Sequence, residues 1–315
     1  MPFRTLFFGT PTFAVGCLDA LAEISTVVGV VCQPDKPAGR GMTLHPPPIK
    51  VRALELGLPV VQPTKLRTGD FAKWVREQNV DVALVVAYGR ILPKDVLDAP
   101  RLGCVNVHAS LLPKYRGAAP ITWAVVHGET ESGVTMMLLD EGMDTGATLE
   151  AFAIPIGESE TAGQLSDRLA LVGAAAVRTS LPRFVAGGYV PVKQDDARAT
   201  LAPMLKKDDG AIDFAKPARA VHDHVRGMSP WPGAHTKLHG KILKVHEAKV
   251  SPGIEARALA LPGEVLVADK GHLLVACGEG AVELSSVQPE GKRAMRGVEW
   301  VMGRGVKEGE RFGSP

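Results

Sequence analysis

The feature that most constrains the fold is a regular alternation of short apolar runs with helix-like segments through the first 190 residues. Runs rich in β-branched and other apolar side chains predict strands at residues 4–8, 26–32, 81–86, 103–107, 134–140 and 148–154. Helix-like patterns occupy residues 11–22, 48–57, 70–78, 120–127 and 162–185. Because the strands are apolar along most of their length, we expect a largely parallel sheet with helices on both faces. This predicts a Rossmann-like α/β domain over residues 1–189.

The pattern changes in the last third of the chain. Residues 190–208 are polar and irregular, which is typical of a linker. A helix near residues 217–228 is followed by short strand-like runs at 234–238, 242–248, 263–268, 273–277 and 282–288, separated by turn-forming residues. This spacing predicts a small OB-like β-barrel domain over residues 209–315.

Composition excludes few functions but limits the setting. The net charge of +2 neither demands nor excludes nucleic acid, although residues 190–315 carry 19 Lys and Arg against 16 Asp and Glu. The four cysteines form no Cys-x-x-Cys pair and are expected to be buried thiols in a reducing compartment. No apolar stretch approaches the roughly 20 residues that span a bilayer, and no signal peptide precedes the first strand, so we expect a cytoplasmic protein. No residue cluster has metal-ligand spacing, and we expect no metal.

Asn106 and His108 stand two residues apart at the end of an apolar run, so in a strand they share a face. Ligands of such sheets gather at the carboxyl ends of the strands. Asp144 follows another apolar run, in a Gly-flanked turn. An amide can polarise a carbonyl, an imidazole can exchange a proton near neutral pH, and a carboxylate can stabilise the imidazolium. Taken alone, the first two could simply close a strand, but Asp144 favours acyl transfer without a covalent intermediate.

The sequence around these residues resembles the folate-dependent formyltransferases. The resemblance is carried by Gly-Cys-Val-Asn-Val-His-Ala-Ser-Leu-Leu-Pro-Lys-Tyr-Arg-Gly at 103–117 and by Gly-Met-Asp-Thr-Gly at 142–146. It extends over nearly the whole chain, including Phe-Gly-Thr-Pro at 8–11, Val-Ala-Tyr-Gly-Arg-Ile-Leu-Pro at 86–93 and Ser-Pro-Trp-Pro-Gly-Ala at 229–234. It implies that Asn106, His108 and Asp144 are catalytic. It also implies transfer of a formyl group from 10-formyltetrahydrofolate to the α-amino group of methionyl-initiator tRNA.

The folate donor is expected at the carboxyl edge of the sheet. The resemblance implies folate contacts from Ser110, Leu111, Leu112 and Pro113. The turn after the apolar run at 82–86 is the predicted pterin slot, because exposed backbone can pair with the pterin edge. In this turn the side chains of Tyr88 and Ile91 could line the pterin ring, Gly89 is a further candidate contact, and Asp140 is assigned to the same site. An ordinary strand-to-helix turn is the alternative. A dinucleotide cofactor is not expected, since only Gly9 and Gly16 of a three-glycine fingerprint are present.

Two segments are candidates for contact with tRNA. Residues 33–48 form a stretch without periodicity that is long for a connector, and such loops are often functional. The resemblance implies that Arg40, in this loop, contacts the acceptor end of the tRNA. Lys206 and Lys207, in the expected linker, could follow a phosphate backbone. In both cases a solvated surface segment is the alternative.

Three other functions remain open from the sequence. The chain could formylate a nucleotide-linked amino sugar or hydrolyse formyl-tetrahydrofolate, because both activities need the same three catalytic groups. A non-enzymatic RNA-binding module built on the barrel is a third, which the catalytic trio disfavours. The chain is expected to act as a monomer.

Overall fold

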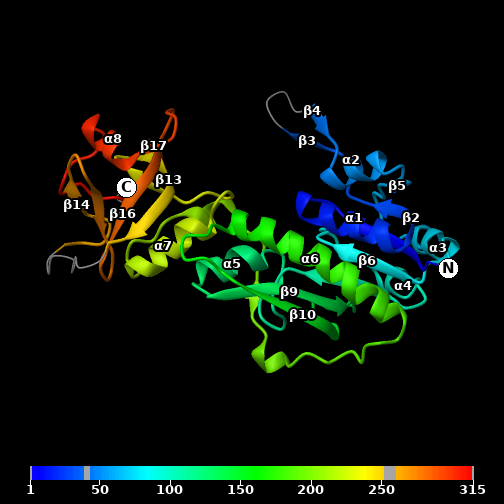
Figure 1. Ribbon diagram of the computed structural model, residues 1–315. Coiled ribbons are helices and arrows are strands. Elements are labelled where there is room, and N and C mark those ends of the chain that lie inside the picture. The colour runs from blue at the N-terminus through cyan, green and yellow to red at the C-terminus, as the bar shows by residue number, and fades with distance from the viewer. Residues whose placement is uncertain (1, 39–42, 252–259, 314–315) are drawn as a thin grey trace. The chain divides into compact units, whose positions relative to one another are not determined.

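The chain forms two compact units. The computed structural model describes residues 2–38, 43–251 and 260–313 (Figure 1). Unit 1 comprises Met1–Pro120, Glu131–Pro155 and Ser166–Pro203, and unit 2 comprises Ile121–Thr130, Ile156–Leu165 and Met204–Pro315. Within the described ranges, no helix is both long and apolar enough to cross a membrane.

Unit 1 is built on a seven-stranded sheet in the order β10-β9-β7-β6-β1-β2-β5. The pairs among β1, β2, β5, β6 and β7 are parallel, whereas β9 is antiparallel to β7 and β10. The strands are β1 (Arg4–Gly9), β2 (Thr26–Val31), β5 (Val60–Val61), β6 (Val82–Val86), β7 (Cys104–His108), β9 (Glu131–Leu138) and β10 (Thr148–Pro155). The helices of this part of the chain are α1 (Val15–Ile24), α2 (Pro48–Glu55), α3 (Asp70–Glu77), α4 (Lys94–Leu97) and α6 (Ala162–Val185), the last of which begins within unit 2.

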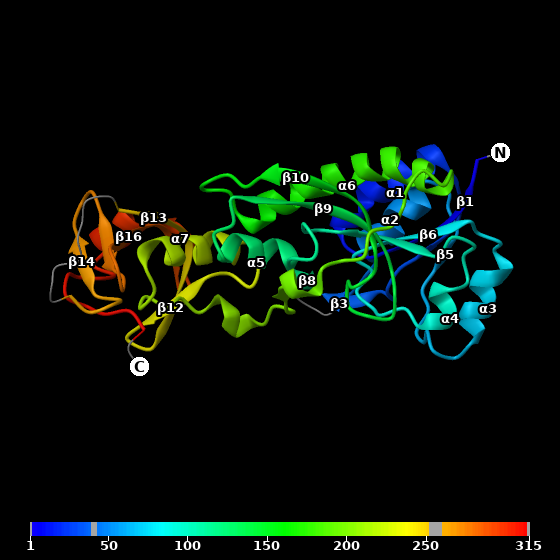
Figure 2. The ribbon, with the colours of Figure 1, turned by 90° about the horizontal axis from the view of Figure 1, so that it is seen from below.

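Helices cover both faces of this sheet, with α1 and α6 on one side and α3 and α4 on the other (Figure 2). Cys104 of β7 belongs to the core cluster that includes residues of α3 and α4. A Cβ on Gly173 of α6 would lie 3.2 Å from the Val107 side chain, so Val107 points to the opposite face. Because side chains alternate along a strand, Asn106 and His108 share the face of Cys104.

Residues 190–203, expected to be the first part of a linker, pack along unit 1. β11 (Leu201–Ala202) pairs in parallel with β8 (Arg116–Gly117), which follows β7 in the chain. The Arg116 N–H donates to the carbonyl of Thr200 at 2.9 Å, and Thr148 and Val192 form a further antiparallel bridge. Backbone hydrogen bonds therefore hold this segment against β8 and the start of β10, which lie next in the chain to the candidate catalytic residues. Domain boundaries at 189 and 209 remain our proposal.

Residues 33–48, expected to be a long loop, contain a short two-stranded antiparallel sheet. β3 (Lys36–Ala38) pairs with β4 (Thr43–His45). The expectation of a loop throughout residues 33–48 is therefore wrong for these six residues. The sequence has no periodicity here because strands of three residues are too short to show one. Arg40, the predicted tRNA contact, lies outside the described residues.

Unit 2 contains an antiparallel sheet in the order β12-β13-β16-β15-β14, with β17 also paired to β16. The strands are β12 (His235–Leu238), β13 (Lys241–Val250), β14 (Val265–Ala268), β15 (Leu273–Ala276), β16 (Ala281–Pro289) and β17 (Met295–Arg296). Residues near the C-terminus bridge the two edge strands, since Val265 N–H donates to Glu310 O at 2.8 Å and Gly313 N–H donates to Lys237 O at 3.0 Å. The curled sheet confirms the OB-like prediction, as the largely parallel sheet of unit 1 confirms the Rossmann-like one.

The core of unit 2 includes a buried charged cluster on α7 (Ala218–Gly227). The Asp223 carboxylate accepts hydrogen bonds from Arg226 Nε at 2.7 Å and Arg219 Nε at 3.0 Å, and lies 3.1 Å from His222 Nδ1. Burial alone would raise the pKa of this carboxyl, but the bonds from His222, Arg226 and Arg219 outweigh burial, so the pKa lies below its ordinary value. The cluster holds a charge that the surrounding apolar core would otherwise disfavour. The remaining helices of the unit are α5 (Pro120–Val126), which begins at the end of unit 1, and α8 (Gly297–Met302).

Candidate active site

Asn106 and His108 lie at the carboxyl end of β7 and are almost fully buried, with 8% and 5% of their surface exposed. Asn106 pairs in register with Val85 of β6 and Met137 of β9. Neighbouring strands on both sides therefore fix the backbone that carries the amide and the imidazole. The sequence pattern predicted this shared face correctly.

The contacts of the His108 ring define its tautomer. Nε2 lies 2.9 Å from the carbonyl oxygen of Tyr115, which can only accept a hydrogen bond, so Nε2 carries a proton. Nδ1 faces Asp144, whose Oδ2 lies 3.7 Å away. This separation is too long for a direct hydrogen bond but short enough for strong electrostatic attraction once Nδ1 is protonated. Nδ1 is therefore the nitrogen available to take up a proton.

Asp144 is held in an unusual backbone conformation. Its φ of 55° lies in the left-handed region, which non-glycine residues seldom occupy. The Gly117 N–H donates to its Oδ2 at 2.8 Å, so the carboxylate is tied to the segment that follows β7. Gly146 must be glycine, because a Cβ there would lie 1.9 Å from the Leu138 carbonyl oxygen. The Gly-flanked turn thus lets the loop return close to β9 and place Asp144 beside His108.

Asp140, assigned to the folate site, has its carboxylate engaged within this loop. Its Oδ1 accepts hydrogen bonds from Gly142 N–H at 3.0 Å and from the Thr145 hydroxyl at 2.7 Å. The side chain is nevertheless exposed. The observed contacts therefore give Asp140 a role in shaping the loop, and any contact with folate would use its remaining oxygen.

Residues 110–113 form a fixed turn after β7. The buried Ser110 hydroxyl donates to the Lys114 carbonyl at 2.6 Å. Thr135 of β9 donates from its hydroxyl to the Ser110 carbonyl at 2.7 Å and accepts from Leu112 N–H at 3.1 Å. The Leu112–Pro113 peptide is cis, and Leu111, Leu112 and Pro113 are partly exposed. The turn thus leaves apolar side chains accessible while its polar groups bond internally.

The turn after β6 exposes backbone rather than the aromatic ring expected there. Tyr88 is 2% exposed, and its ring packs edge-on against Phe8 in the core. Its carbonyl accepts from the Thr10 hydroxyl at 2.9 Å and Gln33 Nε2 at 3.0 Å. Gly89 is exposed with a φ of 77°, and Ile91 is 68% exposed. Of the three predicted pterin contacts, Gly89 and Ile91 are therefore accessible, and the Tyr88 ring is not.

Several residues that build the site escaped the sequence analysis. Thr135, the carbonyl of Tyr115 and the N–H of Gly117 all contact the predicted residues directly. The Arg116 guanidinium is also buried, where it bonds to Gln194 and Asp196. Backbone groups carry no sequence signal, and Thr135 is one of several polar residues in β9, so only the register with His108 identifies it.

Lys206 and Lys207 lie in unit 2, at the start of a short 3-10 helix at Lys207–Gly210. Both are exposed, and the Lys206 N–H donates to Asp209 Oδ2 at 2.6 Å. The catalytic candidates all belong to unit 1. A group of His, Cys, Asp and Glu side chains able to hold a metal ion does not occur among the described residues.

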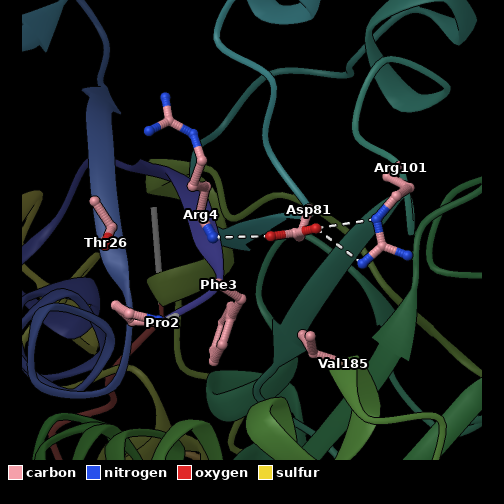
Figure 3. Close-up of a pocket in the computed structure, with 7 residues that line it drawn as sticks. All are labelled: Pro2, Phe3, Arg4, Thr26, Asp81, Arg101 and Val185. Carbon is pink, nitrogen blue, oxygen red and sulfur yellow. Dashed lines mark hydrogen bonds and ion pairs between the residues drawn. The ribbon is translucent and has the colours of Figure 1, made fainter.

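A cavity of 530 Å³ lies away from these residues, where the strands β1, β2 and β6 begin (Figure 3). Asp81 is one of the residues that line it and accepts hydrogen bonds from the Arg4 N–H at 2.9 Å and from Arg101 Nη2 at 2.8 Å. These two contacts, the Arg4 N–H foremost, hold the pKa of Asp81 below its ordinary value. Ligands of parallel α/β sheets bind at the opposite ends of the strands, and the ion pair here is internally satisfied. We therefore assign this cavity to structure rather than to catalysis.

Comparison with known proteins gives matches over nearly the whole chain. The formyl transferase family matches residues 3–181, and the formyl transferase C-terminal domain family matches residues 204–305. Methionyl-tRNA formyltransferase of Sorangium cellulosum (strain So ce56) is 53% identical over 310 residues, covering 98% of this chain and 99% of the relative. The enzyme of the same description from Myxococcus xanthus (strain DK1622) is 49% identical over 308 residues, covering 98% and 97%.

Solved structures share the fold at lower identity. An N-formyltransferase from Helicobacter canadensis, in complex with folinic acid and dTDP-3-aminofucose, superposes with a TM-score of 0.69 at 17% identity, covering 92% of this chain and 100% of that one. HypX from Aquifex aeolicus, in complex with tetrahydrofolic acid, superposes with a TM-score of 0.61 at 18% identity. This chain is covered to 98% in that match but spans about half of HypX, 49% of its length.

Proposed function

This chain belongs to the formyltransferase family, and we propose that it transfers a formyl group from 10-formyltetrahydrofolate to the α-amino group of methionyl-initiator tRNA. The observation that carries the proposal is the 53% identity, over 98% of this chain, with methionyl-tRNA formyltransferase of Sorangium cellulosum. The solved N-formyltransferase from Helicobacter canadensis, whose structure contains dTDP-3-aminofucose, is only 17% identical and supports the fold alone. The amino-sugar and hydrolase alternatives therefore rank below transfer to tRNA.

The carboxyl edge of the unit 1 sheet fits a reduced folate. A pterin needs backbone donors and acceptors along one edge and apolar contacts on its faces. The turn after β6 offers exposed backbone at Gly89, and Ile91 and Met143 are large apolar side chains that are 68% and 61% exposed. Met143 immediately precedes Asp144. These features support donor binding beside the catalytic candidates, with Leu111, Leu112 and Pro113 as further contacts.

Each catalytic candidate has a distinct task when donor and acceptor are bound. The donor supplies a formyl carbon that is open to attack by a neutral amine. The Asn106 amide N–H donates to the formyl oxygen as negative charge develops there, a contribution of about 3 kcal/mol in comparable sites. His108 takes up the proton of the attacking amine at Nδ1 and returns one to the departing nitrogen. The bond from Nε2 to the Tyr115 carbonyl keeps the ring oriented throughout.

Asp144 stabilises the imidazolium that this proton uptake creates. Its carboxylate faces Nδ1 and stays in place through the bond from the Gly117 N–H. The 3.7 Å between Oδ2 and Nδ1 leaves room for a proton on Nδ1. The carboxylate can therefore stabilise the imidazolium without accepting its proton. His108 therefore acts as the proton carrier and Asp144 as its fixed counter-charge.

The proposal extends to the rest of the chain. The region of residues 209–315 would hold tRNA, aided by Arg40, Lys206 and Lys207, while residues 1–189 bind folate and catalyse transfer. Six of the nine histidines lie after position 190, and basic residues outnumber acidic ones there, which supports assigning tRNA binding to residues 209–315. The protein would act as a cytoplasmic monomer without a bound metal.

The acceptor can be tested directly. The protein is incubated with formyl-labelled 10-formyltetrahydrofolate and, in separate reactions, methionyl-initiator tRNA, an amino-sugar nucleotide, or no acceptor. The proposal expects label on the methionyl α-amine and little formate without acceptor. Label on the sugar alone, or equal release as formate in every reaction, would overturn it.

A further inference from the structure

The side chain of Gln194 is buried beside the loop that carries Asp144. Gln194 itself lies between residues 3–181 and residues 204–305, the two regions that match the formyl transferase families. It is 6% exposed. Its Nε2 donates to the carbonyl of Asp144 at 2.9 Å and to that of Gly146 at 2.7 Å. Its Oε1 accepts two hydrogen bonds from the buried guanidinium of Arg116, from Nε at 3.0 Å and Nη2 at 2.8 Å.

The orientation of this amide is fixed by its partners. Arg116 offers only donors, and the two loop carbonyls offer only acceptors. Oε1 must therefore face Arg116 and Nε2 must face the loop. Arg116 is itself held by the exposed carboxylate of Asp196, at 2.8 Å, and by pairing of β8 with β11.

The loop needs this support because Asp144 has a left-handed backbone, which costs about 1 kcal/mol or more for a non-glycine residue. The Gly117 N–H holds the Asp144 carboxylate, but this bond does not restrain the backbone of Asp144. Gln194 fixes the carbonyls on either side of Thr145, and so restrains the backbone from which the carboxylate projects.

We propose that Gln194, oriented by Arg116, is a positioning residue that sets the distance between the Asp144 carboxylate and His108 Nδ1. It touches neither substrate and acts only through Asp144. The inference deepens the proposed function, since it assigns part of the catalytic machinery to the segment that joins the two matched family regions.

The sharpest variant is Gln194→Glu, which keeps the size of the side chain and the oxygen that Arg116 binds. It replaces the donating NH₂ with an oxygen that repels both loop carbonyls. We expect kcat to fall about 10-fold or more, with the KM of the folate donor changed by less than about three-fold. Arg116→Lys, which loses the two-bond fork to Oε1, should give a loss in the same direction if the first variant does not fold.

The same change is then made in an Asp144→Asn background. If Gln194 acts only through the charge of Asp144, Gln194→Glu should cost less than about two-fold there. Gln78→Ala is the matched control, because Gln78 donates to the Trp74 carbonyl at 3.1 Å far along the chain from the site, and its turnover should equal that of the parent.

An equal loss in both backgrounds, or no loss in the parent, would overturn the proposal. Turnover of the unaltered protein in this assay tests the proposed function separately. If the unaltered protein transfers formyl to another acceptor, the ratios between variants are measured with that acceptor and still decide the role of Gln194.

Discussion

Replacing Asp144 with Asn removes the charge that faces His108 while leaving the shape of the site nearly unchanged. Asn can accept the hydrogen bond from the Gly117 N–H and tolerates the left-handed backbone of this position better than most residues. At 3.7 Å and an effective dielectric constant of about 20, the carboxylate and an imidazolium attract by about 4 kcal/mol. If that attraction is realised only when Nδ1 is protonated, Asp144→Asn should lower kcat about 10³-fold.

The assay is single-turnover formylation of methionyl-initiator tRNA with saturating donor, together with thermal unfolding. The melting temperature should stay within about 3 °C of the parent, because no core contact is removed. Asp98→Asn is the control, since Asp98 pairs with Lys94 on the surface and is 60% exposed. A loss of less than about 10-fold for Asp144→Asn, in a folded protein, would refute the reasoning that charge is its contribution.

Three further predictions follow from other parts of the structure. Asn106→Ala should lower kcat roughly 100-fold, because one oxyanion donor contributes about 3 kcal/mol, and a rapid-quench rate within about three-fold of the parent would count against its role. Asp223→Ala should reduce the free energy of unfolding in urea by about 3 kcal/mol, since it leaves the Arg226 guanidinium buried without the carboxylate that balances its charge. Because the pKa of Asp223 is lowered in the folded state, its charge stabilises the fold fully above about pH 4, and this stabilisation is lost as pH falls through the folded-state pKa. The unfolding free energies of the parent and the variant should therefore converge in acid. A difference between them that does not change with pH would contradict this. Burial raises the pKa of Cys17, Cys104 and Cys277 to about 12 and that of Cys32 to about 11. A thiol reagent at pH 8 should therefore label the protein only after denaturation. Stoichiometric labelling of the native protein would contradict this.

The catalytic face could be predicted because it obeys local periodicity. Asn106 and His108 are two apart in a run of apolar residues, and a strand places such residues on one face whatever its neighbours do. Gly142 and Gly146, on either side of Asp144, likewise predict a tight bend of the chain there. Fold class followed from the same kind of signal, repeated over many elements.

Other parts of the site depend on tertiary contacts that leave no local mark. Gln194 lies in a polar, irregular segment that is typical of a linker, and only its burial against Arg116 and the Asp144 loop reveals its place. Tyr88 illustrates the opposite error, because its position in a predicted binding turn suggested an exposed ring, whereas packing against Phe8 turns it inward. In both cases burial, which depends on distant segments, decided what the side chain contacts.

The most direct test of the account is single-turnover transfer by His108→Gln, because the whole mechanism depends on proton movement at Nδ1. Gln can still donate to the Tyr115 carbonyl but cannot carry the amine's proton. The account predicts a rate at least about 10²-fold below the parent with donor affinity, measured by equilibrium dialysis, unchanged within about three-fold. Transfer at the parent rate by the folded variant would contradict it.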